Sequence, residues 1–335
     1  MKKFATIFLS MMLSLIAVFG IACSPETQKG KVNIKYYQKG KDVVSCILGG
    51  SETIGLVPEP AATNLEANYL KNKGQALYRL DLQELYDKDA KAYPQAVLMV
   101  KKSVLGANPN LVSTLQTKIS ESASWIKQNT AIAVSAVNNN GGVELNAQNL
   151  TESAIDGCKI YWESASDAKT SVKKYINKII EIDSAKASAV SDDFFYTGET
   201  ESGTAKASYT FMAPDGAPAL AIAKLIYNND DLGTGKSVNY SVISSNQVMP
   251  NLSSGSADVI VAPVNLASQY YKANGNDYVM VAVLTHGNFY IMSTTQISIA
   301  DLNGKQVAVP NQGAVPDWTF KMVLTKNKLT YITVE

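Results

Sequence analysis

The sequence has few of the side chains that build metal sites, Cys–His catalytic pairs and nucleic-acid surfaces. It contains one histidine, His286, one arginine, Arg79, and 3 cysteines. So little histidine and cysteine excludes a zinc cluster or a Cys–His pair, and we expect neither a metal nor a cofactor. The formal net charge of +1 at pH 7 provides no electrostatic footprint for nucleic acid.

Long apolar runs are missing after the amino-terminal stretch. Two lysines at the start precede an apolar run over residues 4–21, and the small residue Ala22 stands before Cys23. The pattern resembles a bacterial lipoprotein signal, in which Cys23 is lipidated and becomes the first residue of the mature chain. No later segment is apolar enough to span a membrane.

From this resemblance we expect residues 1–22 to be a signal peptide and residues 23–30 a tether. The protein would then be an extracytoplasmic lipoprotein, anchored to the membrane through Cys23, at the cell surface or in the periplasm. Gly20 departs from the leucine that is usual three residues before the lipidated cysteine. A plain secretory signal or an anchor helix is the alternative.

With Cys23 lipidated, Cys46 and Cys158 remain. Cys46 lies on the apolar face of an expected helix, and Cys158 stands shortly before Trp162. Buried free thiols are the favoured interpretation, with a disulfide as the alternative.

A strand that ends in a Pro- or Gly-containing loop and runs into a helix recurs along the chain. The clearest example is residues 208–229, where an alternating strand ends in Pro-Asp-Gly and Ala217-Pro218 opens an apolar helix. Such repeated units predict parallel, doubly wound sheets, and therefore an α/β fold. The loops of this kind are 58–63, 214–217, 263–267, 285–288 and 310–315.

These loops form one candidate site if they meet at a common cleft, because ligands bind at the carboxyl ends of strands in open α/β sheets. An ordinary turn without a ligand is the alternative. The length of 335 residues suits two domains. Residues 197–207 are small and polar, and we interpret them as a linker.

Several of these segments together resemble the substrate-binding proteins of ABC importers, in the subgroup of thiamine-pyrimidine, sulfonate and nitrate binders. The resemblance implies two α/β lobes with a ligand cleft between them, a periplasmic-binding-protein-like fold. The matching segments are MAPDGAPALAIAKL, ADVIVAPVNLAS, VLTHGN, DLNGKQVAVPNQGAVPDWTF and GLVPEPAATN.

The order of the segments departs from that family. The family begins with the unit found here at Met212–Pro218, and it ends on a tail like Asp192–Tyr196, which precedes that unit here. We therefore hypothesise a circular permutation, with the family's usual ends joined through residues 197–207. Old termini that lie close together make such a rearrangement tolerable.

The permutation implies interleaved lobes. One lobe is expected to comprise residues 95–196 and 204–292, and the other residues 31–80 and 298–335. The chain would cross between lobes near residues 292–298 and near residues 80–94.

The resemblance also nominates ligand-binding residues. Asp215 and Glu59 are expected to accept hydrogen bonds from ligand amines, and the backbone N–H groups at residues 216–217 and 313–315 to hold an acidic group. A solvated carboxylate is the alternative for Glu59, and a structural role for His286. The nominated residues are Asp215, Gly216, Ala217, Asn265, Thr285, His286, Gly287, Asn288, Asn311, Gln312, Gly313 and Glu59. Core packing is favoured for Tyr209, Phe289 and Trp318.

The implied function is capture of a small molecule between two hinged lobes and delivery to an ABC permease, by a monomer that is not an enzyme. The acids near the expected cleft and the shortage of arginine favour a neutral or cationic heterocycle. A ligand-sensing surface lipoprotein is one alternative. A pyrimidine-synthase-like enzyme is another, although the Cys-rich motif of that activity is absent.

Overall fold

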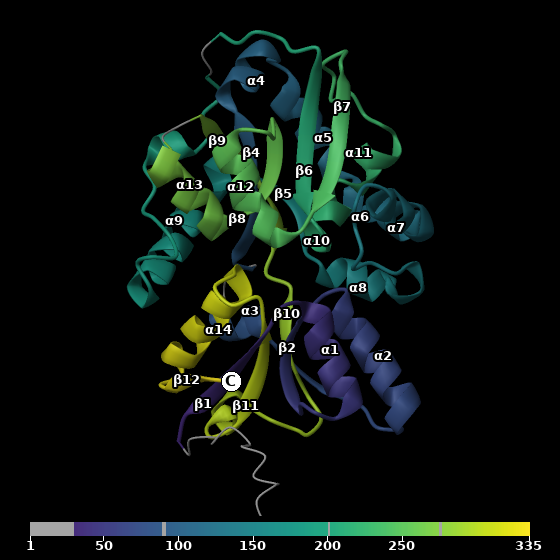
Figure 1. Cartoon of the computed structure of the whole chain (residues 1–335), viewed down its shortest axis with the longest axis vertical. Coiled ribbons are helices and arrows are strands. Elements are labelled where there is room, and N and C mark those ends of the chain that lie inside the picture. Colours follow the sequence, from purple (N-terminus) through teal and green to yellow (C-terminus); the bar gives the residue numbers. More distant parts are fainter. Residues whose placement is uncertain (1–29, 89–91, 200–201, 275–276) are drawn as a thin grey trace, which may run out of the picture.

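Two sheets organise the molecule. The computed structural model describes residues 30–88, 92–199, 202–274 and 277–335. In this part of the chain the strands form two six-stranded sheets, which Figure 1 shows one above the other, each with its own helices. We call the upper half in Figure 1 lobe A and the lower half lobe B.

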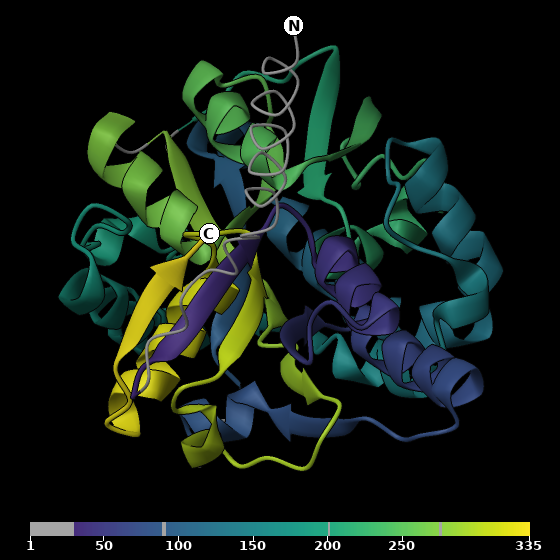
Figure 2. The same ribbon diagram turned by 60° about the horizontal axis from the view of Figure 1, so that its bottom comes forward.

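Lobe B is built from two segments that lie far apart in the sequence. Its helices are α1 (Gly40–Gly49), α2 (Ala61–Lys73), α3 (Leu82–Tyr86) and α14 (Val315–Lys326). Its strands, in neighbour order, are β12 (Tyr331–Val334), β1 (Val32–Tyr37), β11 (Gln306–Pro310), β2 (Ile54–Pro58), β10 (Phe289–Ser293) and β3 (Tyr78–Asp81). Figure 2 shows β12 and β1 side by side at the edge of this sheet.

Lobe A takes the middle of the chain. Its strands, in neighbour order, are β5 (Ile160–Ser164), β9 (Tyr278–His286), β4 (Pro94–Lys101), β8 (Val259–Pro263), β6 (Ser208–Pro214) and β7 (Ser237–Ile243). Its helices are α4 (Lys102–Ala107), α5 (Leu111–Ser120), α6 (Ser122–Gln128), α7 (Thr130–Asn139), α8 (Glu152–Gly157), α9 (Ala165–Ile182), α10 (Ala217–Ala221), α11 (Ala223–Tyr227), α12 (Val248–Ser254) and α13 (Val264–Asn274).

Both sheets are mixed. Strand β1 runs parallel to β11 and β12, and β6 runs parallel to β7 and β8. Strand β10 is antiparallel to its neighbours in lobe B, as β4 is in lobe A. Helices flank both sides of each sheet (Figure 1), so both faces of the central strands are buried. The predicted fold class, α/β with two doubly wound lobes, is confirmed. The expectation of parallel sheets is wrong in part, because β10, β4 and β5 run antiparallel to their neighbours. The circular order stays a prediction.

Local sequence signals explain where the elements begin. Helix α9 buries Ala165, Ala168, Val172 and Ile176, a spacing of three and four residues that places them on one face. The side chain of Ser164 caps its first turn by accepting the N–H of Asp167.

The chain crosses between the lobes at two places. One crossing leads from β3 and α3 into β4, within the expected residues 80–94. The other lies between His286 and Phe289, because β10 pairs with β2 and β3 of lobe B. The expectation that residues 289–292 belong with lobe A and that the crossing lies at 292–298 is therefore wrong. A polar stretch, residues 285–288, separates β9 from β10, but β10 is as apolar as β9, so the sequence does not show that β10 joins the other sheet.

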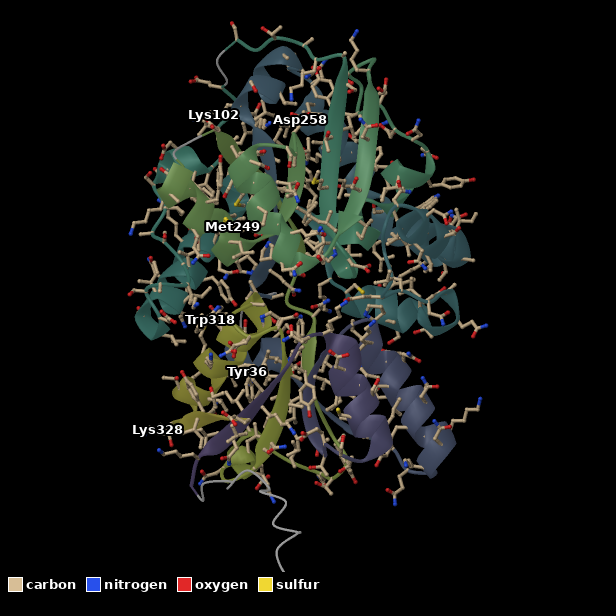
Figure 3. All side chains as sticks on the ribbon, in the orientation of Figure 1. Tyr36, Lys102, Met249, Asp258, Trp318 and Lys328 are labelled. Atoms are coloured by element: carbon tan, nitrogen blue, oxygen red, sulfur yellow. The ribbon has the colours of Figure 1, made fainter. Side chains whose placement is uncertain are left out.

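The core has one part in each lobe and one part shared. One apolar cluster lies within lobe A, around Leu98 and Phe211, and another lies within lobe B, around Val43 and Leu65. A third joins the two lobes, because it includes Val309 of lobe B and Tyr175 of lobe A. Side chains fill both lobes in Figure 3, which places Trp318 at the end of α14 nearest lobe A.

Candidate ligand-binding cleft

A cavity of about 440 Å³ lies between the lobes. Its lobe B wall includes the ends of β2 and β11, at Pro58 and Pro310, and its lobe A wall includes Pro214 and Pro263 at the ends of β6 and β8. The carboxyl ends of these four strands therefore face each other across the cavity, which is the usual ligand position in open α/β sheets.

Each of the five loops predicted from the sequence contributes at least one residue to the cleft wall. Six nominated residues line it, and the other six do not. The lining residues are Glu59, Asp215, Gly216, Ala217, Asn288 and Asn311. The nominated residues away from the wall are Asn265, Thr285, His286, Gly287, Gln312 and Gly313.

Asp215 is bonded within the protein. One carboxylate oxygen accepts the backbone N–H groups of Val143 and Glu144, at 2.6 and 3.0 Å. The other oxygen accepts the N–H of Gly216 at 2.8 Å. The expected acceptor for a ligand amine therefore holds the loop of residues 141–146 against the end of β6 instead.

Glu59 is likewise paired. Its side chain is fully buried, and one oxygen lies 2.6 Å from Arg79 Nη2 and 2.8 Å from Thr63 Oγ1. The second oxygen accepts the N–H of Thr63 at 3.1 Å, in the first turn of α2. Arg79 in turn lies over the ring of Tyr290, 3.4 Å from its centroid. The only arginine in the sequence thus neutralises Glu59 from behind the cleft wall.

His286 has a structural position outside the cleft. Its ring stacks on Tyr161 with centroids 3.6 Å apart, and Nε2 lies 2.9 Å from the Glu163 carboxylate. Only 1% of the residue is exposed. Ligand contact was the open alternative for His286, and this packing within lobe A favours the structural role.

Most of the other nominated residues away from the wall have structural roles. Asn265 of α13 donates to the carbonyl of Gly313 at 3.4 Å, which bridges the two lobes. A side chain at Gly287 would collide with the ring of Tyr93, so only glycine fits there. Thr285 is buried in β9, whereas Gln312 is exposed.

Of the three aromatic residues considered, two belong to the core. Tyr209 is buried and its hydroxyl accepts the side-chain N–H of Asn108. Trp318 is buried and donates to the carbonyl of Gly313. Phe289, for which core packing was favoured, is buried but also lines the cleft.

Sequence reasoning missed charged residues on both walls. Lys39 and Lys41 line the lobe B wall at the start of α1, and neither forms an ion pair within the described residues. The sequence contains a signal for these lysines, because Lys39-Gly40-Lys41 lies between a strand and a helix, as the five predicted loops do. Glu144 lines the opposite wall.

Glu144 has a shifted pKa. Its side chain is exposed along the open cleft, but the protein atoms around it desolvate the carboxyl group. This desolvation raises the pKa of Glu144, and the charge of Asp215 raises it further, whereas Lys39 and Lys41 oppose the shift.

The lobe B wall also carries the starts of three helices. Gly40, Ala61 and Val315 are the first residues of α1, α2 and α14, and all three line the cleft. The first N–H groups of a helix lack intrahelical acceptors and carry partial positive charge. The lobe B wall is therefore electropositive, since Glu59, the acid among its lining residues, is paired with Arg79.

The described part of the chain has neither a metal-binding cluster nor a membrane-spanning helix. No group of three or more His, Cys, Asp or Glu side chains is arranged there to hold a metal ion. None of the helices found in those residues has the length and apolar character needed to cross a bilayer.

Comparison with known proteins gives distant structural similarities. No protein-family model matches the chain, and no curated protein does. The PBP AgaA from A. tumefaciens R10, solved in complex with agropinic acid, is 11% identical with a TM-score of 0.35; the match covers 86% of this chain and 58% of AgaA. NikA from Brucella suis, in complex with Fe(III)-EDTA, is 9% identical with a TM-score of 0.32, over 78% of this chain and 57% of NikA.

A third similar structure is NikZ from Campylobacter jejuni in complex with Ni(L-His). It is 12% identical with a TM-score of 0.33, and the match covers 84% of this chain and 59% of NikZ. The chain thus spans somewhat more than half the length of each of these proteins.

Proposed function

We propose that this protein is an extracytoplasmic solute-binding protein that captures a small molecule between its two lobes and delivers it to an ABC importer. The observation that carries the proposal is the cleft, where strand ends of two α/β lobes enclose about 440 Å³. That volume lies within the range of small-molecule sites. Two chain crossings link the lobes, as hinge closure around a ligand requires.

The proposal includes membrane attachment through a lipid on Cys23. Residues 1–29 lie outside the described part of the chain, so the basis is the sequence pattern of a basic start, an apolar run and Ala22-Cys23. Mass spectrometry of the protein from membranes tests this, because a Cys23→Ala variant should lose both the lipid and the membrane association.

The charge of the ligand follows from the unpaired groups on the walls. The expectation of a neutral or cationic heterocycle rested on acids near the cleft, and both Glu59 and Asp215 are bonded within the protein. Lys39 and Lys41 on one wall face Glu144 on the other. We therefore propose a neutral or zwitterionic molecule with polar groups at both ends.

Ligand-induced stabilisation tests the function directly. The full chain in mild detergent is heated with a panel of vitamins, pyrimidines, sulfonates, amides, amino acids and inorganic anions. A ligand present at about 100 times its Kd stabilises by about 2.7 kcal/mol, so its unfolding midpoint should rise by several degrees. A panel in which no compound raises the midpoint at millimolar concentration would contradict the proposed function.

A further inference from the structure

Both crossings between the lobes place an amide side chain on the cleft wall. Gln95 is the second residue of β4, where the chain enters lobe A from α3. Asn288 lies between β9 and β10, in the other crossing. The two positions are neighbours in space, because β4 and β9 are adjacent strands and the N–H of Gly287 donates to the carbonyl of Tyr93.

Each of these amides has a buried oxygen with no hydrogen-bond partner among the described residues. Five other side chains have a buried polar atom without a partner among the described residues, a nitrogen in Trp162 and an oxygen in the rest, and none of them lines the cleft: Tyr93, Ser122, Trp162, Asn265 and Thr285. A buried acceptor without a donor costs free energy, so such groups are rare in folded proteins unless something else bonds to them.

The orientation of Asn288 is set by its neighbours. Only 1% of the residue is exposed, and its Nδ2 donates to the carbonyl of Glu59 at 3.2 Å. The backbone N–H of Glu59 donates back to the carbonyl of Asn288 at 2.9 Å. With the nitrogen engaged, the group that Asn288 presents is its oxygen, an acceptor. The Gln95 amide bonds to no described residue, so it can present either its oxygen or its nitrogen.

We propose that Asn288 and Gln95 form a recognition subsite for the N–H edge of an uncharged amide group on the ligand. The ligand nitrogen donates to Asn288 Oδ1, and Gln95 bonds to the remaining donor or acceptor of the same planar group. This inference rests on the proposed function and names the chemistry of the ligand's inner end. A primary carboxamide fits better than an ammonium group, because the nearby carboxylate of Glu59 is already paired with Arg79.

The position of the subsite also connects binding with closure. A ligand held by one residue from each crossing bonds to both segments about which the lobes turn. The bound amide therefore lies at the hinge end of the cleft, and the electropositive helix starts of lobe B remain available for its other end.

The test compares nicotinamide with N,N-dimethylnicotinamide, which keeps the carbonyl and lacks both N–H donors. Affinities for the full chain are measured by calorimetry, alongside thermal unfolding without any compound. We expect nicotinamide to bind about tenfold more tightly than its dimethyl analogue. Gln95→Met and Asn288→Leu, both close in size to the native side chains, should each bring that ratio close to one.

The control is Gln116→Met, which replaces an exposed amide on α5, away from the cleft wall, and should leave the ratio unchanged. Without any compound, Gln95→Met should unfold at the wild-type temperature or higher, because it removes a polar atom that has no partner. A lower midpoint would show a structural role for Gln95 and overturn the inference.

Equal binding of both amides, or an unchanged ratio in both Gln95→Met and Asn288→Leu, would also overturn the inference. So would stabilisation by sulfonates or anions with no response to nicotinamide, although the proposed function would then stand. Failure of every compound in both panels contradicts the proposed function itself.

Discussion

Gly157 sets how closely the lobes approach each other at one side of the cleft. It is the last residue of α8 in lobe A, and a Cβ built there would lie 2.6 Å from Cγ of Glu59 in lobe B. Glu59 cannot move aside easily, because Arg79 and Thr63 hold its carboxylate. The contact between the lobes at this point therefore requires glycine.

Replacing Gly157 by alanine should destabilise the protein. Overpacking of this kind costs about 1–3 kcal/mol, and we expect a loss in the free energy of unfolding within that range, measured with urea. The matched control is Gly49→Ala at the end of α1, where an added Cβ meets nothing within 4 Å. If the two variants have the same stability, the lobes do not approach as described.

The pair of Glu59 and Arg79 should be costly to break. Arg79→Met would leave the buried carboxylate of Glu59 without its cation, at a cost of about 3 kcal/mol. Lys127→Met is the control, since its partner Asp156 is 63% exposed and such pairs contribute less than about 1 kcal/mol. In denaturant unfolding, a smaller loss for Arg79→Met than for Lys127→Met would refute the pairing.

At the scale of elements, the loop of residues 141–146 forms much of the lobe A wall. Asp215 accepts two of its backbone N–H groups, and Glu144 projects from it toward Lys39 and Lys41 of α1. The loop thus brings a carboxyl group with a raised pKa opposite the positive start of a helix in the other lobe.

This arrangement predicts a pH dependence. A carboxyl group whose pKa is higher in the folded than in the unfolded state destabilises the fold as it ionises. Glu144→Gln should therefore match the wild type at pH values below the usual carboxyl range and become the more stable protein as the pH rises through the raised pKa. Stability measured by urea unfolding across this range gives the comparison.

The two lysines provide the check on this pH dependence. They favour the ionised form of Glu144. In a Lys39→Met background, the difference in stability between the protein with Glu144 and its Glu144→Gln variant should therefore be larger at neutral pH. A gap that narrows as the pH rises would be inconsistent with a raised pKa.

An element could be predicted where its own residues mark it, and not where its place depends on partners far away in the sequence. The strand ends were found because Pro and Gly mark them in the sequence, as at Pro214 and Gly216. The place of β10 was not found, because its pairing partners, β2 and β3, lie more than 200 residues away and its own residues are as apolar as those of β9.

The same distinction applies to the candidate site. The loops that reach the cleft were predicted, but the bonding of Asp215 was not, because its N–H donors lie 71 and 72 residues earlier in the chain. Likewise, the residues next to His286 in the sequence do not show whether its ring stacks on Tyr161 or faces the cleft. Gln95 has no loop signal at all, and only the packing of the two crossings identifies it.

For the whole molecule, the order of the elements bears on the hypothesis of a circular permutation. Strands β12 and β1 lie parallel, with Tyr331 beside Val32 and Val334 beside Lys35. The last residue, Glu335, is therefore about four residues along the strand from Val32, a span of about 13 Å at the usual rise per residue. A flexible linker of about six residues covers that span.

We expect a rearranged chain to fold into the same two lobes. In it, Glu335 is joined to Val32 by six Gly and Ser residues, and new ends are opened at residues 200–201, within the segment interpreted as a linker. Permutation succeeds where the new ends fall outside the core and the old ends are near each other. Its near-ultraviolet circular dichroism and its cooperative urea transition should match those of the natural order.

A second permutant, opened at Leu98, serves as the control. Leu98 is fully buried in β4, which pairs with strands on both sides, so breaking the chain there removes the centre of the lobe A sheet and should prevent folding. If the chain opened at residues 200–201 fails to fold while the natural order does, the connection through residues 197–207 is a structural part of lobe A. The permutation hypothesis would then be wrong, because a junction between former ends should be dispensable to both lobes.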